Sequence, residues 1–432
     1  MTERASVAEQ QEQALSRGAR WSIAIVATLT MAVSYVDRQA LAAIAPIVCS
    51  ALSIREREYG VLQSAFSLAY LVGTPLSGIV LDRVGARRGL VLAVLVWSVI
   101  AGAHSMAFSL AALFVLRLGL GLAESPSFPG AAQSVHRVLL ARERATGFGV
   151  LFIGSSLGAA IAPPLATGLA REFGWRSSFV GVALVGLLWI PLWLAVTSRA
   201  RAVLDVSKRD EPAPALKEGA HYRDGAEVER DPNEGVPLLR HSAVWRAVVA
   251  VLFTSPLMAL CFLWSSKLLV ANAGVAPLSV GRFLWIPPVI FDLASIAFGA
   301  LSSRRHRRGV VQSSPKLLFA IAASMAVTGG VLIGRCRDPW SFVLATSVAI
   351  AGGGAMFALL TEDMLSRVSP RKVSTASGIT AASQSVAYVL ANPLIGYARE
   401  RSSDAKVCLV IGLLVLPGAL VWLFTRAPRR TL

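Results

Sequence analysis

The hydropathy pattern is the feature that most constrains the fold. Charged side chains are scarce in twelve stretches of roughly 20 residues or more, which is the length a helix needs to cross a bilayer core. They cover residues 20–48, 59–81, 89–108, 110–134, 146–169, 177–197, 245–270, 282–302, 315–334, 340–363, 374–398 and 406–426. These stretches are continuous and rich in Leu, Ala, Val and Gly, unlike the short alternating strands of a membrane barrel. The sequence therefore predicts an all-α polytopic membrane protein with twelve transmembrane helices.

The distribution of charge predicts how the helices are oriented. The chain has 16% charged residues and a net charge of +17. Its basic residues gather in the loops that follow even-numbered stretches: Arg83, Arg87, Arg88, Arg137, Arg142, Arg144, Arg304, Arg305, Arg307, Arg308, Arg367, Arg371 and Lys372. By the positive-inside rule these loops and both termini are expected in the cytoplasm, with the protein in the plasma membrane. The expected partner of the chain is therefore the lipid bilayer and not a nucleic acid.

A change of composition divides the chain into two groups of six stretches. Residues 198–244 are charged and contain prolines, which is typical of a cytoplasmic linker. We therefore expect a cytoplasmic tail (1–19), an N-terminal six-helix bundle (20–197), the linker (198–244), a C-terminal six-helix bundle (245–426) and a second tail (427–432). A weak repeat supports a duplication, because GIVLDRVGARRG (78–89) corresponds to GALSSRRHRRG (299–309), with Ser303 in place of Asp82.

Three motifs resemble those of a known family. The GxxxDRxGxRR loop, formed by Gly78, Asp82, Arg83, Gly85, Arg87 and Arg88, is similar to the signature loop of the major facilitator superfamily. The segments SYVDR (34–38) and RLGLGLAESPSFPG (117–130) together resemble the anion:cation symporter family. That family includes bacterial hexuronate, galactonate and glucarate transporters and the lysosomal sialic acid exporter. The resemblance implies two six-helix bundles around a central cavity, alternating access, and proton-coupled uptake of carboxylated sugars.

Asp37 and Arg38 lie inside the first apolar stretch, where ionisable groups are costly and often functional. Neighbouring residues point about 100° apart on a helix, so each is expected to have its partner elsewhere. The planar guanidinium of Arg38 suits a carboxylate, although a salt bridge between the first and fourth helices is the alternative. The family resemblance implies that the matching arginine binds the substrate carboxylate and that the matching aspartate takes part in proton coupling.

Arg117 and Glu124 form a second charged pair in the fourth stretch. Seven residues place them on one helix face about 10 Å apart, too far for a direct bond but suited to a polar track. Burial disfavours the ionised form of a carboxylate, which suits a group that exchanges protons near neutrality. The family resemblance favours proton coupling at Glu124, and ordinary pairing within the bundle is the alternative. Pro126 and Pro129 are expected to bend or end this helix.

Several other polar groups at membrane depth are candidates for substrate binding. Neutral side chains that could orient sugar hydroxyls, or could equally be packing residues with satisfied polar tips, are Tyr35, Tyr70, Gln384 and Asn392. Lys267 either binds a second carboxylate or extends to the membrane interface, which we slightly favour. Asp292 is a further intramembrane acid to which we assign no role.

The loop residues Asp82, Arg83, Arg87 and Arg88 are expected to act as a conformational latch, in which charge contacts break during transport. The four cysteines are scattered and suggest neither a disulfide framework nor a metal site. We find no catalytic constellation, phosphate loop or signalling domain, so an enzyme and a sensor are disfavoured.

The function expected from the sequence is proton-coupled import of a small organic anion by alternating access. The anion is expected to be a sugar acid (hexuronate, aldonate or aldarate), with the proton as coupling ion, no other cofactor, and a monomeric protein. An exchanger of organic phosphates or other carboxylates ranks lower, because Lys267 is the only additional cation that could serve it. An exporter of drugs or metabolites would have an acidic cavity without the chemistry of Arg38.

Overall fold

The computed structural model describes residues 15–205, 241–307, 315–368 and 372–425. The expected tails at 1–14 and 427–432, most of the expected linker (206–240), and Arg308 and Arg371 lie outside the described residues. The side chains of Arg142, Arg304, Arg305 and Arg307 are likewise not described.

In the first half of the chain, the described residues form eight α-helices before the short α10. They are α2 (Arg17–Ala43), α3 (Ala45–Ala51), α4 (Glu56–Val84), α5 (Ala86–Ala103), α6 (Leu110–Glu124), α7 (Ser127–Val138), α8 (Ala141–Phe173) and α9 (Trp175–Val196). Two turns of helix follow, at Ser198–Ala200 and in α10 (Arg201–Leu204), so that the start of the expected linker is ordered.

The second half repeats this plan with one irregular helix. Its elements are α11 (Ser242–Ala259), a π-helical turn (Leu260–Trp264), α12 (Ser265–Ala273), a 3₁₀ turn (Pro277–Ser279), α13 (Gly281–Leu284), α14 (Ile286–Arg307), α15 (Lys316–Ile333), α16 (Pro339–Leu365), α17 (Val373–Arg401) and α18 (Asp404–Phe424). Eleven helical spans among the described residues are long and apolar enough to cross a membrane. The long helix outside that set, α17, carries many Ser, Thr, Gln and Asn side chains. The predicted all-helical membrane fold is confirmed.

Local sequence signals explain where several helices begin and end. The Ser109 hydroxyl accepts a hydrogen bond from the backbone N–H of Ala112 at the start of α6. Gly85 ends α4 with φ +86°, a conformation that side chains rarely adopt. The fourth stretch breaks at Ser125 and Pro126, because proline cannot continue the backbone ladder of the preceding turn. The predicted interruption beside Glu124 is therefore confirmed.

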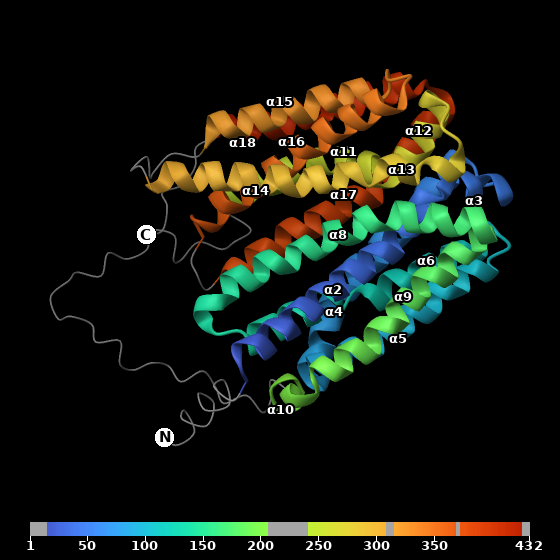
Figure 1. The fold of residues 1–432 in the computed structure, drawn as a ribbon. Coiled ribbons are helices and arrows are strands. Elements are labelled where there is room, and N and C mark those ends of the chain that lie inside the picture. The colour runs from blue at the N-terminus through green and yellow to red at the C-terminus, as the bar shows by residue number, and fades with distance from the viewer. Residues whose placement is uncertain (1–14, 206–240, 308–314, 369–371, 426–432) are drawn as a thin grey trace.

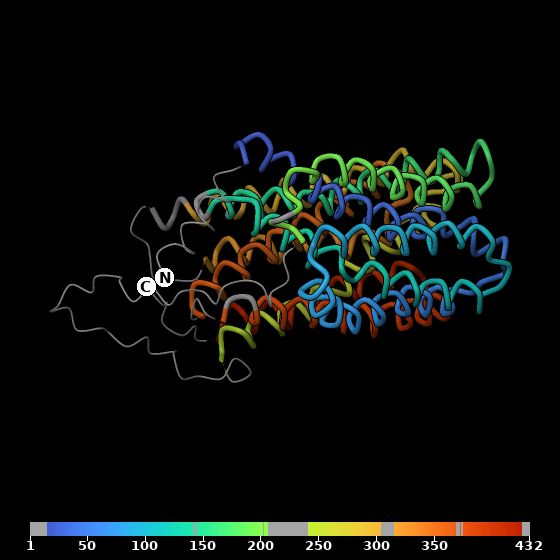
Figure 2. Tube along the Cα trace, turned by 90° about the horizontal axis from the view of Figure 1, so that it is seen from below, coloured from blue at the N-terminus to red at the C-terminus, as the bar shows by residue number. Residues whose placement is uncertain are grey.

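The two halves form two adjacent layers of helices. Helices α2 to α9 lie in one layer and α11 to α18 in the other, and α3, α12 and α13 gather at one end of the molecule (Figure 1). The long helices of both layers run along the same direction when viewed from below (Figure 2). Large apolar side chains such as Leu188, Leu394 and Val410 are 70%, 65% and 64% exposed. Such outward apolar surface suits contact with lipid rather than water.

The halves approach each other most closely through glycines. A Cβ atom at Gly60 of α4 would clash with the backbone of Asn392 in α17, and one at Gly396 of α17 would clash with Glu56. Gly281 likewise lies against the Pro163 carbonyl of α8. Small residues allow this close approach of helix backbones in membranes. Helices α4 and α17, and α8 and α13, are therefore contact points between the two layers.

Glycine packing within the second half generates a stability prediction. A side chain at Gly329 of α15 would collide with the backbone of Ala345 and Ala349 in α16, whereas Gly168 of α8 faces open space. We expect Gly329→Leu to destabilise the detergent-purified protein by about 1–3 kcal/mol through overpacking. Gly168→Leu is the matched control and should unfold at the wild-type temperature. Equal melting temperatures for both variants in tryptophan-fluorescence unfolding would contradict this packing.

Candidate functional site

The charged side chains predicted in the first and fourth stretches meet between α2, α4 and α6 of the first half. Helix α2 contributes Ser34, Tyr35, Asp37 and Arg38, α4 contributes Tyr59, Gln63, Phe66 and Tyr70, and α6 contributes Arg117 and Glu124. The side chains of Asp37, Arg117 and Glu124 are almost completely buried.

Arg38 is held by aromatic rings. Its guanidinium carbon lies 4.6 Å from the Tyr35 ring centre, 4.8 Å from Phe66 and 4.6 Å from Tyr70. Contacts of this length between a cation and a ring face are favourable, and they cover the guanidinium without using its N–H groups. Arg38 Nη2 donates to Glu124 Oε2 at 3.4 Å, a long bond, and Arg38 Nε has no partner among the described residues. Arg38 therefore keeps donors with which it could bind an anion.

Glu124 connects α6 to α2. Its side chain is 0% exposed, and its Oε2 atom accepts a hydrogen bond from the Ser34 hydroxyl at 2.8 Å as well as the long one from Arg38. Its Oε1 atom has no hydrogen-bond partner among the residues that the structure describes. The contact that the sequence suggested as an alternative to substrate binding, between the first and fourth helices, is therefore present, but it leaves both partners incompletely bonded.

Asp37 lies close to this pair without joining it. The residue is 3% exposed, and neither carboxyl oxygen has a hydrogen-bond partner within the described part of the chain. The indole of Trp97 in α5 lies nearby, but its Nε1 atom is also without a partner. A buried polar group without a hydrogen bond is costly, and it is more costly when charged.

Arg117 has a different neighbour from the one expected. Its Nη2 atom donates to Gln63 Oε1 at 2.6 Å, and its guanidinium lies 4.8 Å from the centre of the Phe66 ring. It interacts with Glu124 only electrostatically. Gln63 Nε2 in turn donates to the Tyr59 hydroxyl at 2.7 Å, and that hydroxyl donates to the Leu263 carbonyl at 2.6 Å. Since Leu263 lies in the π-helical turn, these bonds link Arg117 to the second half.

The second half brings neutral groups to this site. The Tyr388 phenol of α17 lies near Tyr35 and Arg38 and beside Gln384. Asn392 is 0% exposed, and both ends of its amide are used in packing. Its Oδ1 accepts from Trp264 Nε1 at 2.9 Å, and its Nδ2 donates to the Tyr388 carbonyl at 2.9 Å.

Asp292 forms another contact between the halves. Its Oδ1 atom accepts a hydrogen bond from the Ser156 hydroxyl of α8 at 2.7 Å.

Lys267 is buried in an ion pair at one end of the molecule. It is 8% exposed, and its ammonium is 2.9 Å from Glu56 Oε1 at the start of α4 and 5.0 Å from the centre of the Tyr59 ring. Glu56 also accepts from Arg399 of α17, with its Oε2 atom at 2.9 Å. One carboxylate of the first half thus pairs with two cations of the second half, at the end where α3 and α12 lie (Figure 1).

The expected latch residues form contacts within the first half. Asp82 accepts from Gln133 of α7 at 3.2 Å. Arg87 donates to the Thr197 hydroxyl at 3.0 Å, and Asp205 after α10 lies 3.7 Å from Arg87 and 3.5 Å from Arg88. Arg83 is exposed.

Sequence reasoning missed several members of this site. Tyr59, Gln63 and Phe66 were missed, although together with the predicted Tyr70 they are spaced by four, three and four residues and so share one face of α4. That spacing was an available signal. Ser34 was part of the SYVDR motif. No sequence pattern marks the remaining members, Glu56, Trp97 and Tyr388. Their contacts depend on which helices pack together.

The described residues contain no group of three His, Cys, Asp or Glu side chains that could hold a metal ion.

Comparison with known proteins identifies the family. The profile of the Major Facilitator Superfamily matches residues 27–391. The chain belongs to this superfamily. It is 26% identical over 413 residues to the hexuronate transporter of Escherichia coli strain K12, covering 94% of this chain and 93% of that one. It is 25% identical to the hexuronate transporter of Bacillus subtilis strain 168, covering 91% and 92% of the two chains.

Two further similarities agree with this assignment. The D-galactonate transporter of Escherichia coli O6:H1 is 23% identical, with 94% of this chain and 95% of that one covered. The crystal structure of a bacterial homolog of the human lysosomal transporter Spinster, inward-facing and unoccupied, superposes with a TM-score of 0.76 at 15% identity. It covers 95% of this chain and 97% of the other. The protein is thus a multi-pass membrane transporter of the major facilitator fold and not an enzyme.

The pairing of Glu56 with Lys267 predicts how tightly this end of the transporter is closed. Cys49 is 6% exposed and lies beside the Lys267 ammonium. In a background where the other cysteines are serine, Lys267→Ala should raise the rate at which a membrane-impermeant maleimide labels Cys49 several-fold, because the ion pair that joins the halves is lost.

The matched control for this experiment is Arg55→Ala. Arg55 is exposed at the start of the same helix, and its side chain pairs with Glu58 of the first half at 2.8 Å. In Arg55→Ala, the maleimide should label Cys49 at the rate of the background protein. Unchanged labelling in Lys267→Ala would show that the pair does not hold this end closed.

Proposed function

We propose that this chain is a proton-coupled secondary transporter that imports a small organic anion, specifically a sugar acid such as a hexuronate, aldonate or aldarate. The observation that carries the proposal is the environment of Arg38. Its guanidinium stacks on three rings beside a buried carboxylate, and its Nε atom has no hydrogen-bond partner among the described residues. The names of the relatives support the substrate class, because they are hexuronate and D-galactonate transporters.

Arg38 is the proposed carboxylate site. A guanidinium can donate two parallel hydrogen bonds to a carboxylate, and the rings of Tyr35 and Tyr70 fix its plane. The side chain is 17% exposed, so part of it remains accessible. Tyr35, Tyr70 and, from the second half, Gln384 and Tyr388 are the proposed contacts for hydroxyl groups. Asn392 would act indirectly by positioning Tyr388, since its own amide is occupied.

Proton coupling follows from competition for Arg38. The Glu124 carboxylate and the substrate carboxylate are both ligands for the same guanidinium. When Glu124 takes up a proton, its attraction for Arg38 falls and the substrate can take its place. One negative charge then replaces another, so the charge buried in the site does not change. Arg117 would stabilise the ionised form of Glu124 through its electrostatic interaction.

Asp37 is the second proposed proton carrier. An ionised carboxylate with both oxygens unpaired would be very costly at this depth, so we infer that Asp37 carries its proton in this conformation. Movement of the halves that exposes Asp37 to water would allow it to release that proton.

Alternating access would occur between the two bundles, proposed as 20–197 and 245–426. The positive-inside rule places both termini in the cytoplasm of a bacterial cell. Glu56, which follows the first helix, then lies on the periplasmic side, and its pairs with Lys267 and Arg399 close that side. The described conformation is accordingly assigned as inward-facing. The loop with Asp82 and Arg87 would latch the cytoplasmic side.

Organic-phosphate exchange is a weaker candidate. A dianionic phosphate would favour another cation from the second half. Lys267, the residue suggested for that role, is paired with Glu56.

The role of Glu124 is tested by removing its charge while keeping its shape. Glu124→Gln, which mimics the protonated form, should abolish accumulation of D-galacturonate driven by a proton gradient in proteoliposomes. Exchange of labelled for unlabelled substrate should persist, because Arg38 remains free to bind. The exposed Glu58→Gln serves as control and should accumulate substrate normally. Full accumulation by Glu124→Gln would refute the assignment.

The role of Arg38 is tested by binding. Arg38→Ala should abolish the rise in melting temperature that D-galacturonate or D-galactonate produces in the wild-type protein, since only a bound ligand stabilises the folded state. Arg38→Lys keeps the charge but loses the fork and the stacking, and should retain only weak stabilisation. Wild-type stabilisation in Arg38→Ala would remove this residue from the site.

A further inference from the structure

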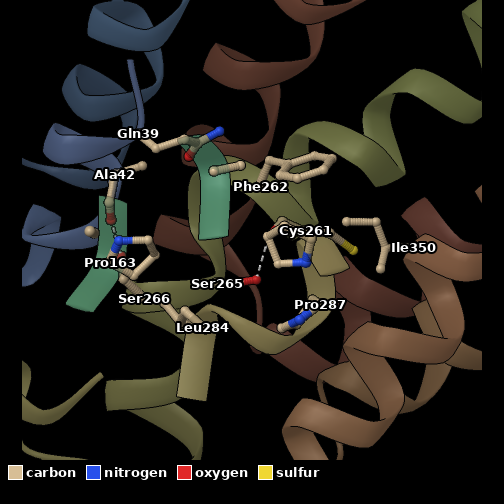
Figure 3. Close-up of a pocket in the computed structure, with 13 residues that line it drawn as sticks. Gln39, Ala42, Pro163, Cys261, Phe262, Ser265, Ser266, Leu284, Pro287 and Ile350 are labelled. Atoms are coloured by element: carbon tan, nitrogen blue, oxygen red, sulfur yellow. Dashed lines mark hydrogen bonds between the residues drawn. The ribbon is translucent and has the colours of Figure 1, made fainter. Parts of the chain in front are cut away.

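A small cavity lies between the two halves of the molecule. Its volume is about 30 Å³. Residues of both halves line it, including Gln39 of α2, Pro163 of α8, Cys261 of the π-helical turn, Ser265 of α12, Pro287 of α14 and Ile350 of α16 (Figure 3). A space of this size holds one or two waters, or a hydroxyl or hydroxymethyl group, but not a sugar ring.

Gln39 is the polar side chain that needs a partner there. It is 6% exposed, and its amide makes no hydrogen bond with any residue that the structure describes. A primary amide has two N–H donors and a carbonyl acceptor, and those of Gln39 are not among the fully enclosed side-chain atoms of the described residues, so they remain in contact with open space. The side chain instead borders the cavity (Figure 3), which indicates that its partner is a group that enters this space.

The wall of the cavity supplied by the second half is also unusually polar for a helix contact. The Ser265 hydroxyl donates to the Cys261 carbonyl at 2.6 Å, which leaves its oxygen able to accept (Figure 3). The π-helical turn Leu260–Trp264 interrupts the regular backbone ladder, a feature that is frequent at functional sites. Pro287 and Pro288 have no backbone N–H, so neither can donate a hydrogen bond to a carbonyl of the preceding turn.

The chemistry of the lining restricts what can bind. None of the thirteen residues around the cavity is charged. A carboxylate or an ammonium would therefore enter without a counter-charge, which is costly in this environment. A hydroxyl group fits, because it both donates and accepts hydrogen bonds, as the Gln39 amide and the Ser265 oxygen require.

The position of Gln39 relates the cavity to the anion site. Gln39 follows Arg38 directly on α2, so the two side chains leave the helix about 100° apart and at nearly the same depth. Arg38 points to Glu124 within the first half, whereas Gln39 borders the second half. Gln39 is therefore the group that an anion of several carbon atoms, held by Arg38 and extending toward the second half, would meet from the same level of α2.

We propose that Gln39 and this cavity form a subsite that binds a hydroxyl group of the transported anion and so selects hydroxylated carboxylates. This inference rests on the proposed function and extends it to a specificity-determining residue. Because the lining comes from both halves, the subsite is complete only where they are in contact.

The experiment compares substrates that differ by one hydroxyl group. Counterflow is measured in proteoliposomes with D-galactonate and with its analogues that each lack one hydroxyl. Gln39→Met keeps the length of the side chain and removes its hydrogen bonds. We expect wild-type protein to favour D-galactonate over one of the analogues about tenfold in apparent affinity. Gln39→Met should lose that preference and keep the wild-type affinity for that analogue.

Ser265→Ala tests the same subsite from the other half and should weaken the same preference, which keeps the test decisive if Gln39→Met does not fold. The control is Ser324→Met, an exposed position on α15 that should leave all affinities unchanged.

The outcomes separate the two proposals. An undiminished preference in Gln39→Met, or an equal loss of affinity for D-galactonate and every analogue, would overturn the subsite while leaving the proposed function intact. Wild-type protein that transports neither D-galactonate nor D-galacturonate would overturn both.

Discussion

The contact between Arg38 and Glu124 is the interaction on which the rest of the site depends. Both groups lie at membrane depth, where a charge is tolerated only with a counter-charge, hydrogen bonds or a polarisable surface. The site supplies all of these, because Arg38 rests on three aromatic rings and Glu124 accepts from Ser34. The pairing remains incomplete on both sides. A fully satisfied salt bridge would be a structural element, whereas an incomplete one can exchange partners.

The halves of the transporter divide the chemistry unequally. The charges around Arg38 belong to α2 and α6 of the first half, while the second half adds the neutral Tyr388 and Gln384. Charged contacts across the halves occur at the end of the molecule, between Glu56 and the two cations Lys267 and Arg399. This separation keeps the charges buried around Arg38 within one bundle.

A continuous set of hydrogen bonds connects the site with the other half. It runs from Arg117 through Gln63 and Tyr59 to the carbonyl of Leu263. Tyr59 also faces Lys267, so the same ring borders the ion pair at the end of the molecule. These hydrogen bonds give a physical route by which a change in charge at Glu124 would alter the contact between the two halves.

The sequence by itself determined which stretches form long helices, because lipid requires long apolar helices, and it predicted the break beside Glu124. It also predicted that Asp37, Arg38, Arg117 and Glu124 are special, since charges inside apolar stretches are costly without a partner. The partners themselves were decided by tertiary structure. Nothing near Lys267 in the chain identifies Glu56, and Asn392 is occupied only because Trp264 packs beside it. Hydropathy is a local property of the chain, whereas an ion pair or a cavity depends on which faces of distant helices are brought together.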